Sequence, residues 1–228
     1  MILKVLDHKK ENKDSFSLIL EKPEGINFYP GQYLDVELSV SDSQTETRIF
    51  SISSSPSENF VMLTYKIGIT PYKQSLQNLR SGDFVRSSHP AGTVVIDDSS
   101  PACLLSGGIG IAPHRSMIKW AVDRNLNLPI TLIYSNSDSD FIFKKELDLW
   151  QKQSASWRTK LNIHYVVTGK DGRLTPDKLQ KTLNPKYLIL DTIYYLAGPP
   201  TMVDEFENIL IKLGVDSTNI RTDRFDGY

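Results

Sequence analysis

Cysteine is nearly absent from this chain of 228 residues, with Cys103 as the single example. One cysteine excludes a disulfide within the chain, and it excludes an iron–sulfur or zinc site held by four cysteines. Because Cys103 lies in the apolar run 102–105, we expect a buried and inert thiol. The sequence therefore predicts no metal site.

Long apolar runs and an excess of one charge are also missing. The first ten residues contain neither a long apolar core nor a small-residue cleavage site, so they do not resemble a signal peptide. The most apolar stretch elsewhere, residues 187–197, is too short to span a bilayer and contains Asp191. The formal net charge of −1 gives no general attraction to nucleic acid or anionic membranes. We expect a cytoplasmic protein without a membrane span or a nucleic-acid partner.

The two halves of the chain differ in the period of their apolar residues. Up to residue 98, short alternating strands separated by turns indicate an antiparallel barrel or sandwich, with one helix near 72–79. After residue 100, buried strands alternate with helices, which is typical of a parallel sheet. The sequence predicts an N-terminal antiparallel Greek-key β-barrel, residues 1–98, followed by a Rossmann-like parallel α/β domain, residues 99–228. The helices of the second half are expected at 113–124, 144–154, 176–182 and 200–213.

A glycine-rich turn follows the first strand of the second half. Gly107, Gly108 and Gly110 lie between that strand and a helix that contains Pro113 in its first turn. Glycines permit close backbone approach, and a helix N-terminus presents unpaired N–H groups, so the turn suits a pyrophosphate. A plain turn that binds nothing is the alternative. Gly198 marks a second strand–glycine–helix junction, which would face the same crevice.

A third candidate segment is the strand end 48–54. Arg48 and Phe50 share one face of this strand, and Ser51 takes the other. An arginine binds phosphate, an aromatic ring offers a stacking surface, and a serine hydroxyl donates a hydrogen bond to a ring nitrogen. Taken alone, the segment favours an ordinary edge strand with a surface arginine over a binding site.

Taken in order, these segments resemble the ferredoxin–NADP reductase family of flavoproteins. That family joins an FAD-binding barrel to an NAD(P)-binding domain, and it passes a hydride from nicotinamide to flavin N5 and electrons onward. Since the chain lacks cysteines for an iron–sulfur cluster of its own, the resemblance implies an external acceptor, such as a ferredoxin-like carrier, an oxygenase or a small molecule. A flavin reductase that uses free flavin as substrate and a non-catalytic docking subunit are the alternatives. The resemblance is carried by segments 30–33, 48–54, 68–76, 82–83, 90–92, 107–113, 141–147 and 198–203.

The resemblance also implies roles for individual residues. Arg48 would hold the FAD pyrophosphate, Phe50 would stack on the isoalloxazine, and Ser51 would act in catalysis beside N5. Either Tyr228, as a further catalytic candidate, or Phe225 would cover the flavin. The other FAD contacts would come from Ile52, Tyr65, Lys66 and Ser75, and the nicotinamide nucleotide would be held by Gly107, Gly108, Gly110, Pro113, Gly198, Pro199 and Met202.

The chain departs from the family pattern in places that bear on the nucleotide. Ala197 stands where the family commonly has a cysteine beside the hydride path, and His89 stands where a glycine often precedes the barrel proline. The loop 134–140 has no cation and two aspartates, which would repel a 2′-phosphate, so NADH is preferred over NADPH. Arg115 and Arg173 are the cations that would reach this site and favour NADPH instead.

Overall fold

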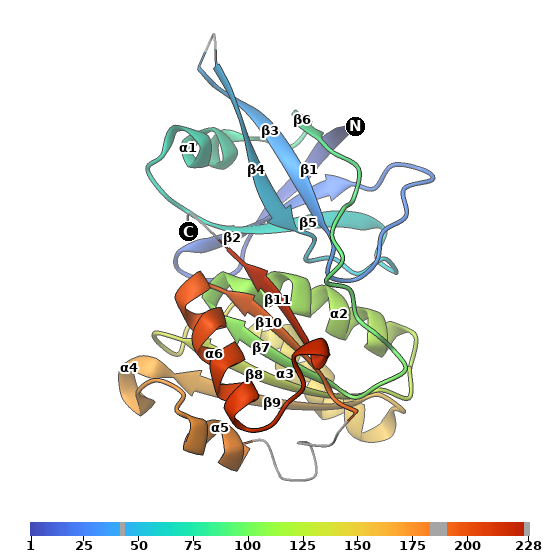
Figure 1. Ribbon diagram of the computed structural model, residues 1–228. Helices are drawn as coiled ribbons and strands as arrows, with labels where there is room; N and C mark the ends of the chain where they lie inside the picture. Colours follow the sequence, from blue (N-terminus) through green and yellow to red (C-terminus); the bar gives the residue numbers. More distant parts are fainter. Residues whose placement is uncertain (42–43, 183–190, 226–228) are drawn as a thin grey trace.

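The structure is a computed structural model that describes residues 1–41, 44–182 and 191–225. Two sheets lie one above the other, an antiparallel sheet from the first half of the chain and a parallel sheet with helices from the second (Figure 1). The segment 88–101 connects them. The predicted fold class is confirmed.

The first sheet has six strands in the order β4-β3-β6-β1-β2-β5. Its side chains alternate in burial along β3, and the inward ones, such as Leu34 and Val36, are fully buried. A short helix, α1 (Pro71–Asn78), follows β5 and packs Tyr72 and Leu76 against the same core. The strands are β1 (Ile2–Lys10), β2 (Ser15–Glu21), β3 (Tyr33–Ser41), β4 (Gln44–Ser51), β5 (Phe60–Lys66) and β6 (Phe84–Ser87).

This sheet curls like a barrel without closing along its length. β4 and β5 are its two edge strands, and an isolated bridge between Ile52 and Leu63 joins them just beyond the end of β4. The N–H of Ser53 donates to the carbonyl of Met62 beside it, at 2.8 Å. The gap between β4 and β5 is therefore held shut at one end and open along the rest of β4.

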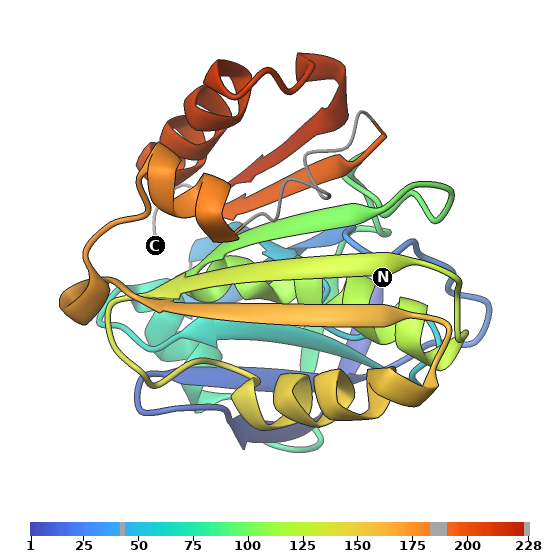
Figure 2. The same cartoon turned by 90° about the horizontal axis from the view of Figure 1, so that it is seen from below.

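The second sheet is parallel, in the order β11-β10-β7-β8-β9. Figure 2 shows its helices on both faces. One face packs on α2 and α3 through residues such as Leu104 and Tyr134, and the other packs on α5 and α6 through residues such as Leu105 and Leu196. The elements are β7 (Ala102–Gly107), α2 (Ile111–Asp123), β8 (Pro129–Asn136), α3 (Lys144–Gln153), β9 (Lys160–Val167), α4 (Thr168–Asp171), α5 (Pro176–Thr182), β10 (Ile193–Gly198), α6 (Pro200–Lys212) and β11 (Ile220–Arg224), with 3₁₀ turns at Gly108–Gly110, Ser154–Ser156 and Ser217–Asn219.

Most predicted helices lie within two residues of their observed bounds. The helix expected from Pro113 begins earlier, at Ile111, because a 3₁₀ turn over the glycines leads directly into it. Strands β1, β6 and β11 were not predicted. No helix among the described residues is both long enough and apolar enough to cross a membrane.

Candidate cofactor sites

A pocket of about 630 Å³ opens in the gap beside β4. Its walls come from β3, β4 and β5 of the first sheet, from α1 and from the C-terminal strand of the second sheet, so both halves of the chain build it. Aromatic rings, two arginines and a lysine dominate the lining, a combination that suits a large aromatic ligand carrying phosphates. The lining residues are Tyr33, Thr47, Arg48, Ile49, Phe50, Ser51, Tyr65, Thr70, Tyr72, Lys73, Leu76, Asp223, Arg224 and Phe225.

Arg48 and Phe50 both line this pocket, and so does Ser51, which a period of two places on the other face of β4. The guanidinium carbon of Arg48 lies 5.4 Å from the centre of the Tyr72 ring, and the Phe50 ring stacks on the same tyrosine at 6.1 Å. Arg48 also donates to Glu46 at 2.5 Å. The arginine is thus held at the pocket by an aromatic face and a carboxylate, while its side chain stays 55% exposed and accessible to an anion.

The first turn of α1 lines the same pocket, through Thr70, Tyr72 and Lys73. Thr70 caps this helix by accepting from the N–H of Lys73, and Pro71 occupies the first helical position. A helix N-terminus beside Arg48 and Lys73 favours a negatively charged group. Ser75, predicted as a phosphate contact, lies instead in a separate hollow with Glu37 and Arg86, and it is not brought together with Arg48.

Ser51 meets a carboxylate from the other half of the chain. Its hydroxyl donates to Oδ2 of Asp223, on β11, at 3.4 Å. Burial raises the pKa of Asp223 to about 6, and the hydrogen bond from Ser51 opposes that shift. The pair therefore places a carboxyl group that titrates near neutral pH in the wall of the pocket.

The two glycine junctions lie side by side, because β7 and β10 are neighbouring parallel strands. Ala197 pairs with Ser106 in this ladder, so Gly107 and Gly198 come at the same edge of the sheet. A Cβ on Gly107 would lie 2.2 Å from the sulfur of Met202, and a Cβ on Gly198 would lie 2.7 Å from its terminal methyl. The two junctions therefore adjoin one another, and Met202 packs over both glycines.

Close backbone packing makes glycine necessary at one further position of this turn. A Cβ on Gly110 would lie 2.1 Å from the carbonyl oxygen of Ala197. Gly108, in contrast, has a φ of +52° and open space around its α-carbon. Gly110 thus lets the turn rest on β10, while Gly108 leaves a free backbone surface for a ligand.

A buried hydrogen bond supports the turn from below. The hydroxyl of Ser106 and Nδ1 of His114 lie 2.6 Å apart, with both residues fully buried. Burial lowers the pKa of His114 to about 3, so the imidazole is neutral at physiological pH. This neutral pair links the end of β7 to the fourth residue of α2.

Phe225 joins the pocket to the glycine crevice. Its N–H donates to the carbonyl of Gly198 at 3.0 Å, and its side chain lines the pocket beside Asp223. The two candidate sites are therefore contiguous at residues 223–225. Tyr228, the other residue considered for this position, lies outside the described residues.

The loop after β8 lies close to cations in the folded chain. Asp138 forms an ion pair with Lys13 of the β1–β2 turn, and Lys66 lines the same small pocket with Gly108. Residues 134–140 contain no cation, as noted from the sequence. In the folded chain, however, Lys13 and Lys66 lie beside this loop. Lys13 and Lys66 face three aspartates in this pocket, which leaves a formal charge of −1.

The two arginines considered for a 2′-phosphate are engaged elsewhere. Arg115 is buried and pairs with Glu58 and Glu146. Arg173 is exposed and pairs with Glu205 on α6. Neither lines the small pocket beside Gly108, which is where the predicted loop meets the glycine turn.

The remaining predicted residues lie around these sites. Ile52 is fully buried in the barrel core, and Tyr65, whose pKa burial raises to about 12, lines the large pocket. Pro113 is buried in the first turn of α2. Pro199 caps α6 next to Gly198, where its carbonyl accepts from the N–H of Met202 at 2.9 Å.

Sequence reasoning missed several pocket residues. Asp223 lies on β11, whose sequence Ile-Arg-Thr-Asp-Arg has no apolar alternation that would indicate a strand. Thr70 and Tyr72 lie at the start of α1, where the Thr-Pro pair at residues 70–71 was the available signal for a capped helix.

Known proteins resemble this chain along almost its whole length. Residues 104–208 match the family described as an oxidoreductase NAD-binding domain. Flavohemoprotein A of Dictyostelium discoideum is 29% identical over 97% of this chain and 59% of its own length. The glycine betaine monooxygenase reductase subunit of Chromohalobacter salexigens is 30% identical over 92% of this chain and 60% of its own length. The chain thus spans about three-fifths of these relatives.

Solved structures share the fold. The FAD/NAD-binding domain of nitric oxide dioxygenase from Vibrio cholerae superposes with a TM-score of 0.82 at 22% identity, with 98% of each chain covered. A ferredoxin–NADP⁺ reductase from Neisseria gonorrhoeae with bound FAD and NADP gives a TM-score of 0.82 at 18% identity, again with 98% of each chain covered. Residues 104–208 thus match an oxidoreductase NAD-binding domain, and almost the whole chain has the fold of these FAD- and NAD(P)-binding reductases.

Proposed function

We propose that this chain binds FAD in the pocket beside β4, takes a hydride from a nicotinamide nucleotide held in the glycine crevice, and reduces an acceptor outside its own two domains. The observation that carries this proposal is the contiguity of the two sites at residues 223–225, where Phe225 contacts Gly198 and also lines the pocket. Hydride transfer requires reacting atoms within about 3.5 Å, so the two ligands must contact each other, which only adjoining sites allow.

The residues of the pocket divide into an anionic and an aromatic part. Arg48, Lys73 and the N-terminus of α1 would hold the pyrophosphate. Phe50 and Tyr65 would bound the ring system, and Phe225 would cover it from the side of the crevice. When bound, FAD would supply the acceptor for the hydride and release the two electrons to the next carrier.

Ser51 and Asp223 are the residues suited to controlling a proton in this wall. The Ser51 hydroxyl is both a donor and an acceptor, and the raised pKa of Asp223 lets Oδ2 hold a proton near neutral pH. Their hydrogen bond connects the two halves of the chain at the point where the sites meet. We infer that Ser51 and Asp223 orient the reacting ring and balance its charge during reduction.

The nucleotide is proposed to be NADH. The small pocket beside Gly108 keeps a formal charge of −1 even with its two lysines counted, and this charge disfavours a further phosphate. Gly107, Gly108 and Gly198 would hold the pyrophosphate and the nicotinamide along the edge of the sheet.

The acceptor is proposed to be a separate protein, such as a ferredoxin-like carrier or an oxygenase component. One observation on a relative supports this: the Chromohalobacter relative is named as a reductase subunit of a monooxygenase.

The decisive experiment is an anaerobic reduction of the purified, FAD-loaded chain with NADH and NADPH in separate stopped-flow series. Bleaching of the flavin bands, with a higher ratio of limiting rate to half-saturating concentration for NADH, is the expected result. A protein that cannot be loaded with FAD would overturn the proposal, and faster reduction by NADPH would overturn the nucleotide assignment. Loss of flavin on gel filtration, together with turnover of added free flavin, would show a flavin reductase instead.

A further inference from the structure

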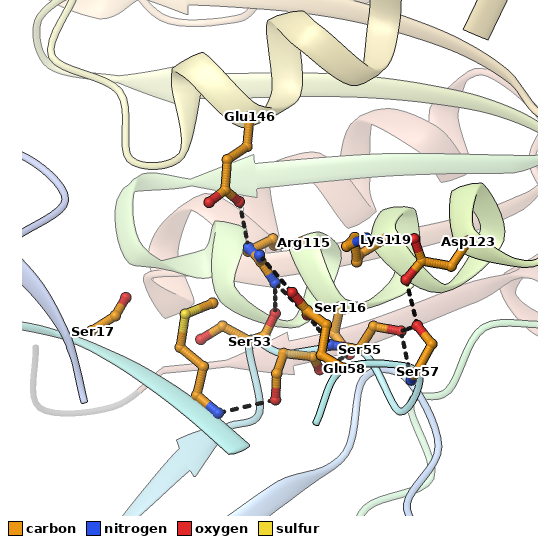
Figure 3. A network of polar contacts seen from close by, with 12 residues as sticks. Ser17, Ser53, Ser55, Ser57, Glu58, Arg115, Ser116, Lys119, Asp123 and Glu146 are labelled. Carbon is orange, nitrogen blue, oxygen red and sulfur yellow. Dashed lines mark hydrogen bonds and ion pairs between the residues drawn. The ribbon is translucent and has the colours of Figure 1, made fainter. Parts of the chain in front are cut away.

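A buried arginine connects the two halves of the chain on the side of α2 that faces the first sheet (Figure 3). The side chain of Arg115 is only 4% exposed. Its Nη1 donates to the backbone carbonyl of Ser53 at 2.8 Å and to Glu58 at 3.0 Å, and its Nη2 donates to the other oxygen of Glu58 at 3.2 Å. Its Nε donates to Glu146, at the start of α3, at 2.9 Å.

Two further hydrogen bonds join α2 to the segment of residues 53–58. The hydroxyl of Ser116 donates to the carbonyl of Ser54 at 2.6 Å, and this bond is buried. Near the other end of α2, the hydroxyl of Ser57 donates to Asp123 at 2.5 Å. Figure 3 shows these groups in a row between the helix and the segment of residues 53–58. The helix is therefore joined to that segment near both of its ends.

The two joined elements each lead directly to one of the cofactor sites. α2 begins at Ile111, immediately after the glycine turn, so it moves with Gly108 and Gly110. The segment 53–58 continues from β4, with Ser53 only two residues beyond Ser51. Contacts made by Arg115 and Ser116 thus relate the position of the nucleotide turn to the position of the flavin strand.

A buried charged group joins two surfaces at a high desolvation cost, so stability alone does not account for Arg115 at this position. A buried ion pair contributes little net stability compared with well-packed apolar residues, because desolvation offsets the attraction. The planar guanidinium, however, fixes direction as well as distance when it is bonded on several sides. Phe143 and Trp150 flank it, with ring centres 5.2 and 5.4 Å from the guanidinium carbon. Hydrogen bonds and two flanking rings thus fix both the position and the orientation of the Arg115 guanidinium.

We propose that Arg115 and Ser116 are positioning residues for hydride transfer, which hold the nucleotide turn of α2 at a set distance from the flavin strand β4. The proposal rests on the proposed function, since it concerns the reaction between the same two sites. Effective transfer depends steeply on placement, and a shift of about 1 Å can cost roughly a hundredfold in rate. Neither residue lines either site, so each acts through the elements it joins.

The test uses the full FAD-loaded chain and anaerobic flavin reduction by NADH. Arg115→Met, which keeps an unbranched apolar stem and loses the guanidinium, should lower the limiting reduction rate by roughly 10- to 100-fold. The half-saturating NADH concentration should change less, because the residues that contact the nucleotide are intact. The isotope effect with NADH deuterated at C4 should rise toward its full value, as hydride transfer becomes more strongly rate-limiting. Arg115→Lys should recover part of the rate.

Ser116→Ala removes one buried hydrogen bond and should produce a smaller loss in the same limiting rate. Arg86→Met is the matched control, because Arg86 forms an exposed pair with Glu37 within the first sheet, at 3.6 Å. It should leave the limiting rate unchanged. All rates are measured at a temperature at which circular dichroism shows each variant folded and the flavin spectrum shows it loaded.

A wild-type limiting rate in folded Arg115→Met would overturn the proposal, even if its melting temperature falls. If that variant does not fold, unchanged limiting rates in both Ser116→Ala and Arg115→Lys would overturn it equally. A wild-type chain that NADH and NADPH both fail to reduce would instead overturn the proposed function. The reduction of the wild-type chain thus distinguishes failure of the proposed function from failure of the positioning role of Arg115.

Discussion

The pocket beside β4 and the glycine crevice are built by opposite means. The pocket is a gap between two edge strands, lined by side chains that reach into open space, and Arg48 at its wall is 55% exposed. The crevice is formed by backbone in direct contact, where a Cβ on Gly110 would meet the carbonyl of Ala197 at 2.1 Å. The chemical identity of side chains therefore determines the first site, and the absence of side chains determines the second.

This difference predicts which kind of substitution damages each site. In the crevice, adding a single methyl group should disturb the packing of β10 against the turn, and the whole second sheet should lose stability. In the pocket, removing a functional group should weaken ligand binding and leave the fold largely intact. The following substitutions test that division, beginning with the largest expected effect.

Gly110→Ala should destabilise the chain by about 3 kcal/mol or more, because backbone atoms of residues 197–198 cannot move aside as a flexible side chain can. Urea unfolding followed by circular dichroism measures the change. Gly108→Ala is the matched control: its Cβ meets open space, so only the left-handed backbone is penalised, at about 1 kcal/mol. Equal losses in the two variants would contradict the role of close packing.

Asp223→Asn should stabilise the flavin-free chain above pH 6. Burial raises the pKa of Asp223 from 3.8 to about 6, so this carboxyl favours folding fully below pH 3.8 and loses that contribution as the pH rises to about 6. An amide avoids the loss, which is on the order of 3 kcal/mol. Urea unfolding at pH 4 and pH 8 gives the measurement, and the advantage of the variant should disappear at the lower pH.

Asp216 provides a control for this pH dependence. Hydrogen bonds from the hydroxyl and the N–H of Thr218 hold the pKa of Asp216 below its usual value, so its contribution to stability is present at neutral pH and is lost on acidification. Asp216→Asn should accordingly shift stability at pH 8 in the opposite direction. A shift of the same sign in both variants would show that the effect does not come from the titration of Asp223.

Arg48→Ala should weaken FAD binding about 30-fold, since a hydrogen bond to a charged group contributes roughly 2 kcal/mol. The exposed position of Arg48 predicts little change in the melting temperature of the flavin-free chain. Fluorescence titration with FAD measures the affinity, with Arg86→Ala as an exposed arginine from the same sheet for comparison. A large loss of stability with unchanged FAD affinity would show that Arg48 stabilises the fold and does not bind FAD.

Lys13→Ala should have the smallest effect, a modest fall in the rate with NADPH relative to NADH. Lys13 pairs with Asp138 at the surface, so its removal leaves the small pocket beside Gly108 more negative. Added salt should reduce the difference, because exposed charges are screened. A rise in the relative rate with NADPH would contradict the electrostatic account of this pocket.

The elements predicted well are those with a strong local signal. The apolar faces of α2 and α6 and the all-buried runs of β7 and β10 appear in the sequence as clear periods, and the structure places them within two residues. β11 was missed because it is an edge strand with a polar sequence, recognisable only by its pairing with β10. Asp223, which lies on that strand, was missed for the same reason.

Periodicity, glycine positions and chain order are local properties. They were therefore sufficient to predict the order of the main elements, the two glycine turns and the place of Arg48, Phe50 and Ser51 at one strand end. Which residues meet across the two halves depends on how the chain folds in three dimensions. The tertiary structure brings Asp223 to Ser51 and Lys13 to Asp138, and it buries Arg115 against Glu58 instead of leaving it free for a phosphate. Such pairings join residues far apart in the chain. They depend on packing and desolvation, which cannot be predicted from a local sequence pattern.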